Sequence, residues 1–571
     1  MKMRYITKRV FVIGDENEKG FVTGGVLSDD GTILFGCDDR LTPEIAKGME
    51  LPEVKAIFCC DYRRSANAGI LNFEKAEKYT DENYCGLLSE PESWWENPKN
   101  RWHLYKTRND GDILAYGASN VKKIAGNGQA EIGGIKIEAL HTPGDTDHSR
   151  SYLVEDDGKK IVFCGGLLCK GGKIPYVFRL TQSIKNDSED DYHGFLCGIP
   201  RWKKSLEAIS RADLAVPYIG GVIENPKSDI AAFCKNIDEL YGKYADIAAL
   251  NYYFDALAQN PETKMEQAKE KDFPGYVRQI GNQCNMLCSK TGSVLAIDCG
   301  GREAVDRLVS MVGRSEIKSV DALYITHYHD DHVDGCEYFR RNFGCPIYAD
   351  KIQADILKNP ARYRLPCISP VSVDVTGLED GHFWRWHEFE LTSMYFPGQT
   401  MYHGALLAKN ADDGNLTLFA GDSFTPAGID DYCAYNRNLL ILGEGYFKCL
   451  GIVRKYMPEY IINQHVSRAF EFTPGQIDYM EKNLYERMRI LRDLCDWENI
   501  NYALDEYLAM AYPYEQKKGE EPKILVGGYA EDIKYEIVPP KKSGKKSVYG
   551  VRIYAKGAYL GQKACFVTDN S

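Results

Sequence analysis

Hydrophobic and polar positions along the chain predict short buried strands that alternate with amphipathic helices. Apolar runs that end in turn residues are typical of buried strands, and two examples are GSVLAIDCG at residues 292–300 and DALYITHYH at residues 321–329. Apolar residues at helical spacing predict a long helix in GQIDYMEKNLYERMRILRDLCDW, residues 475–497. The expected fold class is therefore α/β or α+β.

Segments near the start of the chain resemble segments near its middle, in the same order and at a nearly constant offset. The first pair is GFVTGGVLSDDGTILFGCDD and GNQCNMLCSKTGSVLAIDCGG. By residue number, the pairs are 20–39 with 281–301, 54–73 with 320–339, 141–154 with 395–408, and 160–168 with 416–424. An internal repeat of this length predicts that one domain is present twice.

Changes in composition mark the borders of the expected domains. Residues 256–275 are polar and form the expected linker, between a first domain over residues 1–255 and a second over residues 276–499. Short alternating segments separated by Gly, Pro and Lys clusters predict a small β-rich module over residues 500–571. None of the eleven histidines lies in this module, so we expect it to bind, pack or assemble rather than catalyse.

Length, charge and cysteine content narrow the class of protein. A chain of 571 residues exceeds what one hydrophobic core usually serves. The formal net charge of -12 disfavours nucleic acid as a partner, because a phosphate backbone would meet an unfavourable mean field. No apolar run is long enough to span a membrane, and the N-terminus becomes charged before a signal peptide could form. We expect a cytoplasmic protein whose eighteen cysteines stay reduced.

The stretch YITHYHDDHVDG, residues 324–335, concentrates three histidines and three aspartates. Residues two apart on a strand face the same way, so His327 and His329 can converge on one ion. The turn that follows brings Asp331 and His332 to a neighbouring point. Imidazole nitrogen and carboxylate oxygen suit zinc, and iron or manganese would also fit. A solvated polar turn is the alternative, but this spacing favours a metal site.

These residues, with later motifs in the same order, resemble the metallo-β-lactamase superfamily. LAIDCG looks like its first motif, with Asp298 as a buried acid, and THYHDDHVDG matches the second closely. FPGQTMYH, LFAGDSF and PEYIINQHV look like the third, fourth and fifth motifs. The resemblance is close over residues 276–484 and weak over residues 20–225. It implies a four-layer αβ/βα sandwich, present twice, with a metal site at one edge of the packed sheets.

The resemblance implies two metal ions in the second copy, joined by a bridging carboxylate. The implied ligands are His327, His329 and a third-motif residue for one ion, Asp331, His332 and His465 for the other, and Asp422 as the bridge. Two adjacent cations would lower the pKa of a shared water. The resulting hydroxide, oriented by Asp331, would attack an electrophilic carbonyl, phosphorus or sulfur. Asp331 and Asp422 are therefore the implied catalytic residues.

The third motif departs from the family's pattern. Where the family usually has a histidine after Pro-Gly, this chain has Gln399, and a histidine follows four residues later as His403. A neutral amide is a poor ligand and imidazole a good one, so His403 is the expected ligand. If Gln399 faces the metal instead, the first position lacks one protein ligand. His382 and His387 alternate with aromatic residues and are expected to be structural.

The expected function is a metal-dependent hydrolase with two divalent ions, zinc above all. Its substrate would be a small-molecule ester, lactone, thioester, phosphoester or related compound, and a homo-oligomer is compatible with the sequence. A true β-lactamase is disfavoured, because those enzymes normally carry an export signal. Two alternatives stay open: an iron-dependent oxidoreductase of the same fold, and a non-catalytic ligand-binding or scaffold protein. Residues 504–514, LDEYLAMAYPY, resemble the immunoglobulin-like domain that follows some proteins of this fold.

The first copy lacks most of the implied ligands. Residues 61–69 read DYRRSANAG where the second copy reads HYHDDHVDG. In the first copy, the positions that correspond to these ligands hold Asp61, Arg63, Ser65 and Ala66. Gly166 corresponds to Asp422, and Ile219 lies near the position that corresponds to His465. A guanidinium at a ligand position repels a divalent cation. His141 and His148 lack the other ligands of a metal site, so we expect them to be structural. We expect a metal-free sandwich that serves packing, dimerisation or pocket shape.

Overall fold

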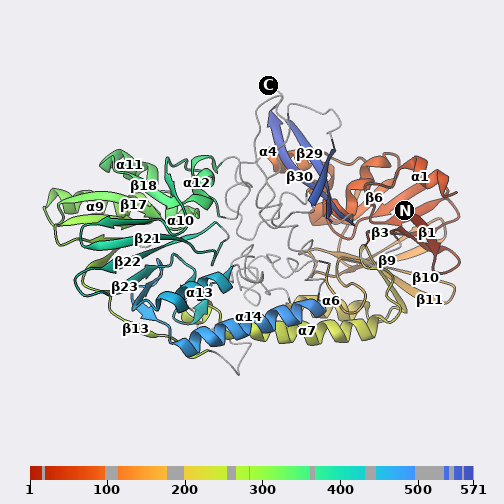
Figure 1. The fold of residues 1–571 in the computed structure, drawn as a ribbon. Coiled ribbons are helices and arrows are strands. Elements are labelled where there is room, and N and C mark those ends of the chain that lie inside the picture. Colours follow the sequence, from red (N-terminus) through yellow and green to blue (C-terminus); the bar gives the residue numbers. More distant parts are fainter. Residues whose placement is uncertain are drawn as a thin grey trace. The chain divides into compact units, whose positions relative to one another are not determined.

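The computed structural model divides the chain into two compact units of helices and strands (Figure 1). One unit contains Met1–Glu239 and Ile490–Ser571, and the other contains Leu240–Arg489. The structure describes residues 1–15, 20–96, 113–175, 199–253, 265–281, 283–360, 367–400, 402–430, 445–494, 533–538, 546–555 and 558–569. The mixed α/β class expected from the sequence is confirmed.

Two sheets form the framework of the first unit. The larger sheet joins its strands in sequence order from β1 to β7, and the smaller has the order β12-β11-β10-β9-β8. The larger contains β1 (Lys2–Tyr5), β2 (Val10–Gly14), β3 (Val22–Leu27), β4 (Thr32–Phe35), β5 (Val54–Phe58), β6 (Glu77–Asp81) and β7 (Val121–Ile124). The smaller contains β8 (Gly128–Ile132), β9 (Ile135–His141), β10 (Arg150–Asp156), β11 (Lys159–Gly165) and β12 (Leu214–Pro217).

The main core of the first unit lies between these sheets. Side chains from both sheets meet there, among them Phe35 from β4 and Phe163 from β11. A second buried cluster covers the other face of the larger sheet, where short helices pack. Because this sheet is covered on both faces, β4 is buried at every position. The helices of the unit are α1 (Pro43–Gly48), α2 (Arg64–Asn67), η1 (Ala68–Asn72), η2 (Glu82–Tyr84), α3 (Cys85–Ser89), α4 (Pro91–Glu96), α6 (Ile199–Ile209) and most of α7 (Pro226–Asp246).

The second unit is also built on two sheets. One has the order β14-β15-β16-β17-β18-β19 and the other the order β13-β27-β26-β23-β22-β21-β20. The first contains β14 (Val277–Gly281), β15 (Cys284–Cys288), β16 (Ser293–Ile297), β17 (Ser319–Ile325), β18 (Ile347–Asp350) and β19 (Thr376–Leu378). The other contains β13 (Lys269–Lys271), β20 (Phe383–Trp386), β21 (Phe389–Tyr395), β22 (Gly404–Asn410), β23 (Leu416–Phe419), β26 (Tyr460–Ile462) and β27 (Ala469–Glu471).

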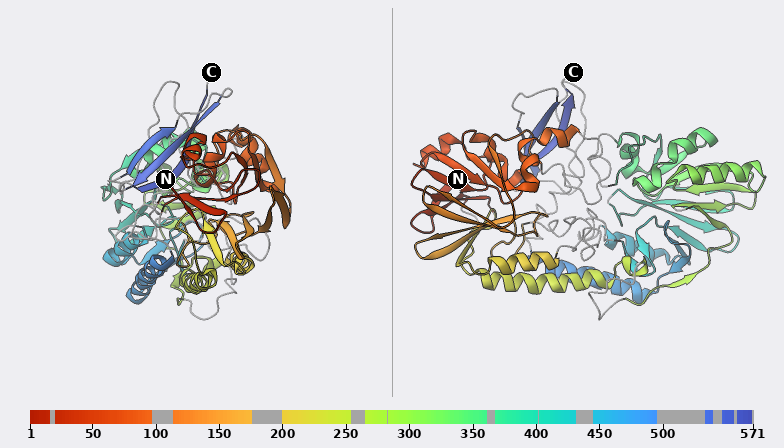
Figure 2. Two further views of the ribbon diagram at one scale, coloured as in Figure 1. Left: turned by 90° about the vertical axis from the view of Figure 1, so that its right-hand side faces the viewer. Right: turned by 180° about the vertical axis from the view of Figure 1, so that it is seen from behind.

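Buried side chains from both sheets form the core of the second unit, among them Leu295, Tyr324, Leu406 and Phe419. Helices lie outside the sheets, so the unit is layered in the order expected for an αβ/βα sandwich (Figure 2). The helices are α8 (Leu250–Tyr253), α9 (Arg302–Gly313), α10 (Asp330–Val333), α11 (Cys336–Phe343), α12 (Lys351–Lys358), α13 (Tyr446–Tyr456) and most of α14 (Pro474–Leu494). A short hairpin of β24 (Phe424–Thr425) and β25 (Gly428–Ile429) follows β23.

The sheets of the two units correspond strand by strand. The order β2 to β7 matches β14 to β19, and β8 to β12 matches β20 to β23 with β26. In both units the central parallel pair has a register irregularity at the same place, after Thr32 in β4 and after Val294 in β16. The residues that follow these strands, Gly36 and Asp298, both have positive φ, at 69° and 59°. This correspondence agrees with the repeat found in the sequence.

The borders between the units differ from the expected domain borders. Residues 256–264 of the expected linker lie outside the described residues. The rest of that segment contains β13, in which Lys269 pairs with Glu471 of β27. The polar composition of this segment predicted a linker. An edge strand can have such a composition, because it pairs through its backbone and needs few apolar side chains. Residues 269–271 therefore belong to a sheet of the second unit rather than to a free connection.

The expected β-rich module near the C-terminus is present as a three-stranded antiparallel sheet. It contains β28 (Ile533–Val538), β29 (Lys546–Ala555) and β30 (Ala558–Asp569) and belongs to the first unit. Tyr554 packs against a buried cluster that includes Ala66 and Ile219, and Arg552 Nε donates to Asp39 Oδ2 at 2.6 Å. The segment with the immunoglobulin-like resemblance, residues 504–514, lies outside the described residues.

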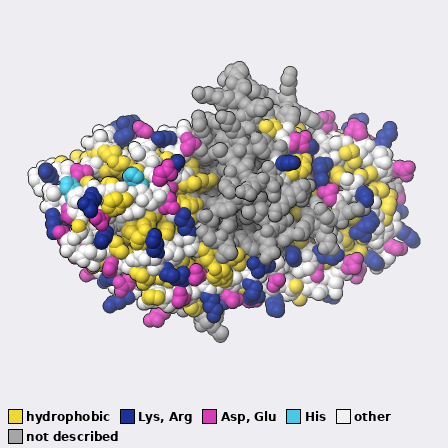
Figure 3. All heavy atoms as spheres, viewed as in Figure 1, with side chains coloured by type: hydrophobic (Ala, Val, Ile, Leu, Met, Phe, Trp, Pro, Cys, Tyr) yellow, Lys and Arg dark blue, Asp and Glu magenta, His cyan; other side chains and the backbone are white. Residues whose placement is uncertain are grey.

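Other features of the described residues bear on the expected class of protein. None of the helices in these residues is both long and apolar enough to cross a membrane. Cysteines such as Cys284, Cys299 and Cys336 are free thiols. On the face shown in Figure 3, acidic and basic side chains are interspersed over the described surface rather than gathered by sign.

Candidate metal centre

The end of β17 positions the first two histidines of the HxHxDH stretch. The strand is central and parallel to both neighbours, and its last four residues are buried. The backbone stays extended through His329, whose φ and ψ are -60° and 150°. His327 Nε2 and His329 Nδ1 therefore lie 3.0 Å apart, with both side chains buried. The sequence-based expectation that residues two apart would converge agrees with this geometry.

The short helix α10 brings the next two residues to the same place. Asp331 and His332 are the second and third residues of this four-residue helix, and His332 is fully buried. This turn packs closely on the loop after β16, because a Cβ atom at Gly300 would lie 1.7 Å from the Asp331 carbonyl oxygen. Glycine at position 300 is what permits this approach.

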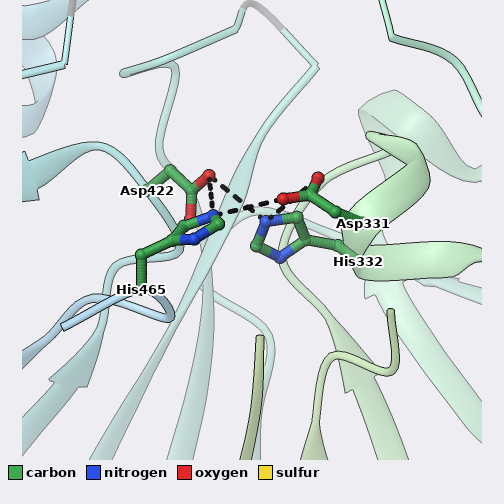
Figure 4. Close-up of side chains that lie close together, drawn as sticks. All are labelled: Asp331, His332, Asp422 and His465. Atoms are coloured by element: carbon green, nitrogen blue, oxygen red, sulfur yellow. Dashed lines mark hydrogen bonds and ion pairs between the residues drawn. The ribbon is translucent and has the colours of Figure 1, made fainter. Parts of the chain in front are cut away.

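Four side chains converge on one point, as Figure 4 shows. Asp331, His332, Asp422 and His465 each offer one atom that lies within 4.8 Å of the other three. Asp422 Oδ2 lies 3.2 Å from His332 Nε2 and 3.0 Å from His465 Nε2. His465 Nε2 also lies 3.2 Å from Asp331 Oδ2. Within the described ranges, this is the one group of three or more such side chains with that geometry.

The second sheet supplies Asp422 and His465. Asp422 follows β23 and His465 follows β26, and these strands are parallel neighbours. The carboxyl ends of parallel strands lie at one edge of a sheet, so residues just beyond them come together there. Gly421, with a φ of 54°, turns the chain so that Asp422 enters the cluster.

Asp298 orients His332. Its side chain is fully buried, and Oδ2 lies 3.0 Å from His332 Nδ1, which leaves Nε2 facing Asp422. Thr326 holds the carboxylate from the other side, because its backbone N donates to Asp298 Oδ1 at 2.6 Å and its hydroxyl donates to Oδ2 at 2.7 Å. A carboxylate behind an imidazole fixes the ring and its tautomer, as metal-binding histidines usually require.

Charge is distributed unevenly over these histidines. Burial alone would lower the pKa of His332, but the carboxylates of Asp422, Asp331 and Asp298 outweigh it and raise that pKa well above its usual range. Burial also acts to lower the pKa of His465, but the carboxylates of Asp422 and Asp331 raise this pKa to about 10. The carboxylates therefore favour positive charge at this point, which a divalent cation would also supply.

His327 and His329 have the opposite character. Burial, with the neighbouring imidazoles, lowers the pKa of His327 well below its usual range. Burial lowers the pKa of His329 to about 4. Both rings are thus neutral near pH 7 and have a nitrogen lone pair available to a metal. His327 Nε2 lies 3.8 Å from Asp422 Oδ2, so this pair adjoins the four-residue cluster through Asp422.

Gln399 and His403 make different contacts beside the cluster. Gln399 Nε2 donates to Asp422 Oδ2 at 3.2 Å. The ring of His403 stacks on that of His327, with centroids 4.6 Å apart, and His403 Nε2 lies 3.5 Å from Ser423 Oγ. Backbone pairing between His327 and His403 fixes His403 in this place. Gln399, not His403, therefore makes the direct contact with Asp422.

Asp430 is a residue that the sequence motifs did not single out. It is buried beside the site, and its Oδ2 accepts a hydrogen bond from Gln399 Nε2 at 3.2 Å. Asp430 directly follows the β24–β25 hairpin. The only sequence signal is an acid a few residues beyond the fourth motif, in a loop whose course the sequence does not specify.

The donor set fits divalent metal ions. Imidazole nitrogens and carboxylate oxygens are the ligands that zinc, iron and manganese take in proteins. His329 Nε2 and Asp422 Oδ1 are buried and make no hydrogen bond within the described part of the chain. Asp331 and His465 keep 41% and 30% of their side chains exposed, whereas His332 and His327 are fully buried. A substrate would therefore approach from the side of Asp331 and His465.

The corresponding place in the first unit holds an ion pair. Arg63 Nη2 donates to the Asp145 carbonyl at 3.1 Å, and its Nε lies 3.8 Å from Asp145 Oδ2. The Arg63 backbone N donates to Asp61 Oδ1 at 2.8 Å. At Gly166 a Cβ atom would lie 2.3 Å from Asp145 Oδ2, so a side chain at the position that corresponds to Asp422 would have to displace the Asp145 carboxylate.

The remaining residues of the first copy lie around this ion pair. Ser65 and Ala66 are buried in α2, and Ala66 and Ile219 belong to the cluster against which Tyr554 of the C-terminal sheet packs. The rings of His141 and His148 lie 5.9 Å apart. Within the described residues of the first unit, no group of three or more metal-ligating side chains comes together.

Comparison with known proteins finds a family model that matches part of the second copy, and similar proteins. A family model described as "Anti-Pycsar protein Apyc1" matches residues 278–345, which contain the HxHxDH stretch. Hydroxyacylglutathione hydrolase GloC of Haemophilus influenzae is 24% identical over 158 residues, which are 27% of this chain and 71% of that protein. Ribonuclease J of Mycoplasma pneumoniae is 30% identical over 122 residues, which are 19% of this chain and 21% of that protein.

Solved structures include a metallo-β-lactamase of Cronobacter sakazakii. It is 15% identical, with a TM-score of 0.31 over 41% of this chain and 97% of its own. The ordered motifs, the paired sheets and the curated relatives make the chain similar to proteins of the metallo-β-lactamase superfamily. This similarity, with the cluster around Asp422, supports divalent metal binding and a metal-dependent hydrolase in general terms.

Proposed function

We propose that the second unit is a dinuclear metal-dependent hydrolase that acts on an ester, lactone, thioester, phosphoester or related bond of a small molecule. The observation that carries this proposal is the convergence of Asp331, His332 and His465 on Asp422. His327 Nε2 lies 3.8 Å from the same carboxylate oxygen and 3.0 Å from His329 Nδ1. The side chains thus form two groups around one shared carboxylate, as a pair of ions requires.

Each side chain has a separate task in this proposal. Two divalent ions, zinc above all, would lower the pKa of a shared water and polarise the reacting oxygen of the substrate. Asp422 would be shared between the two positions, and Asp298 keeps His332 turned toward it. Asp331 is the most exposed carboxylate of the group, so it can orient water and hold a proton during the reaction.

The first unit has a supporting role in this proposal. Its sandwich corresponds strand by strand to the second, which favours a tandem pair of domains of one family. A guanidinium lies where ligands lie in the second unit, and a divalent cation would be repelled there. Packing, dimerisation or shaping of a binding pocket are the roles that remain for it.

The names of the relatives suggest which substrates to test first. GloC is named as a hydroxyacylglutathione hydrolase, which makes an acyl thioester of glutathione the first candidate. Ribonuclease J is named for RNA, and the ribonuclease match covers about a fifth of that protein. A phosphodiester is therefore the second candidate.

Metal analysis and hydrolysis assays test this proposal together. Full-length protein purified without chelator should contain bound divalent metal, with zinc in excess of iron and manganese. It should hydrolyse at least one of an acyl thioester, a lactone and a phosphodiester, lose this activity on dialysis against a chelator, and regain it when zinc is restored. No more than trace metal in the purified protein would refute the proposal. Turnover that requires iron and oxygen would favour the redox alternative instead.

A further inference from the structure

The third-motif position carries an amide between two carboxylates. Gln399 Nε2 lies 3.2 Å from Asp422 Oδ2 and 3.2 Å from Asp430 Oδ2. An ionised carboxylate only accepts hydrogen bonds, so both contacts require the amide nitrogen, and the orientation of the amide follows. Gln399 Oε1 then faces away from both carboxylates. That oxygen is buried and has no hydrogen bond to any residue that the structure describes.

Asp430 is placed by its backbone, independently of the site. Its N–H donates to the Ser423 carbonyl oxygen at 3.1 Å. The hydroxyl of Tyr446 lies 2.8 Å from the carbonyl oxygens of both Ser423 and Asp430. These contacts hold the end of the β24–β25 hairpin beside the fourth motif. Asp430 is thereby positioned to hold the amide of Gln399 against Asp422.

The two groups of ligands are consequently unequal. Asp331, His332 and His465 with Asp422 supply four mutually close ligand atoms, which is the usual number for a zinc ion. The other group has two imidazoles and a share of Asp422, whose Oδ2 lies 3.8 Å from His327 Nε2. The third-motif residue that contacts the shared carboxylate is the amide of Gln399, which donates to Asp422.

A neutral amide is a much weaker zinc ligand than an imidazole. His403 is not part of the group around Asp422, and its ring stacks on His327 with Nε2 3.5 Å from Ser423 Oγ. The group that contains His327 and His329 is therefore one strong ligand short.

We propose that Gln399, held in place by Asp430, makes the two metal positions differ in affinity. The protein binds one divalent ion tightly at Asp331, His332, Asp422 and His465, and a second ion at least ten times more weakly at His327 and His329. This inference rests on the metal centre of the proposed function and adds an order of filling to it. Any reaction that needs both ions would then respond to the free metal concentration, while the tight position stays filled.

Metal titration of the full-length protein tests the inference without an activity assay. Metal-depleted protein is titrated with Zn²⁺ against a chromophoric chelator, and with Co²⁺ while its visible absorption is recorded. The wild-type protein should bind two equivalents in separate steps at least tenfold apart. The Gln399→His variant should bind the second equivalent at least tenfold more tightly, with the first step unchanged and a second cobalt spectrum at low metal concentration.

Two further variants make the test specific. Gln399→Ala removes the amide without adding a ligand, so the second equivalent should stay weak. His403→Ala should leave both steps within about threefold of wild type, and circular dichroism shows whether this buried substitution still folds. Loss of the second equivalent in folded His403→Ala would identify His403 as the ligand and overturn the inference.

Other outcomes separate this inference from the proposed function. Two equivalents of equal affinity in wild-type protein, or a second step that Gln399→His leaves unchanged, would overturn the inference and leave the hydrolase proposal standing. Absence of any bound ion would overturn both.

Discussion

The imidazole of His332 and the carboxylate of Asp298 face each other at 3.0 Å with neither side chain exposed to solvent. This pair connects the HxHxDH stretch, which follows β17, to the residue that follows the neighbouring strand β16. It sets the direction of His332 Nε2 and thus the geometry of the four-residue cluster.

Asp298→Asn should weaken metal binding by about 10-fold to 100-fold. Asparagine tolerates the positive φ of 59° at this position, so the substitution removes the charge while keeping the backbone. The measurement is the dissociation constant of the tightest Zn²⁺ equivalent. An affinity equal to that of wild type would show that Asp298 does not orient His332.

Asp422→Ala should abolish hydrolysis and reduce the metal content. Its Oδ2 is the atom that His332, His465 and His327 all approach, so its loss separates the two groups of ligands. The exposed Asp374 offers a matched control, and Asp374→Ala should keep wild-type metal content and activity. Retention of both properties in Asp422→Ala would contradict the bridging role.

Arg63→Ala should destabilise the first unit by about 3 to 5 kcal/mol without changing the metal content. The substitution leaves the buried carboxylate of Asp145 without this guanidinium, while the backbone N–H of residue 63 still donates to Asp61. Arg211→Ala removes an exposed pair with Glu138 and should cost less than about 1 kcal/mol. Urea unfolding followed by circular dichroism provides the comparison. A lower metal content in folded Arg63→Ala would place an ion in the first unit and refute the metal-free assignment.

Asp350→Asn should make the stability of the second unit less dependent on pH. Burial raises the pKa of Asp350 to about 6. A raised carboxyl pKa stabilises the fold while the group is protonated, and this contribution is lost as the pH rises from about 4 through about 6. The asparagine variant keeps the side-chain oxygen that accepts from Ile352 N, which caps α12.

Relative to wild type, the Asp350→Asn variant should gain up to about 3 kcal/mol between pH 4 and pH 7, measured from urea midpoints. Asp374→Asn, at an exposed position, should show no such gain. A constant difference between the Asp350 variant and wild type across this pH range would show that Asp350 is ionised throughout.

Tyr554→Ala should loosen the C-terminal sheet from the rest of the first unit. Tyr554 packs against the buried cluster that includes Ala66 and Ile219, and Arg552 pairs with the buried Asp39. Limited proteolysis should release the C-terminal sheet several times faster in the variant, and faster again when Arg552→Ala is added. Cleavage at the wild-type rate in the double variant would show that these contacts do not hold the sheet.

The sequence by itself determined the features that depend on local geometry. His327 and His329 are two residues apart at the end of a strand, and Asp331 and His332 follow in the next turn, so chain geometry alone brings them together. The internal repeat likewise predicted two sets of strands in the same order, because the same pattern of buried positions favours the same pairing. The polar composition of the segment that contains β13 predicted a linker, because strand pairing through the backbone does not require apolar side chains.

The tertiary structure decided which distant residues meet those of the motif. Asp422 lies 90 residues from His332 in the sequence, and the two meet because two separate sheets pack with their strand ends at one edge. Gln399 and His403 are only four residues apart, yet one contacts Asp422 and the other stacks on His327. Long-range backbone pairing between His327 and His403 fixes that difference. Such pairing depends on the whole packed unit, so neither the spacing nor the ligand chemistry of the segment could specify it.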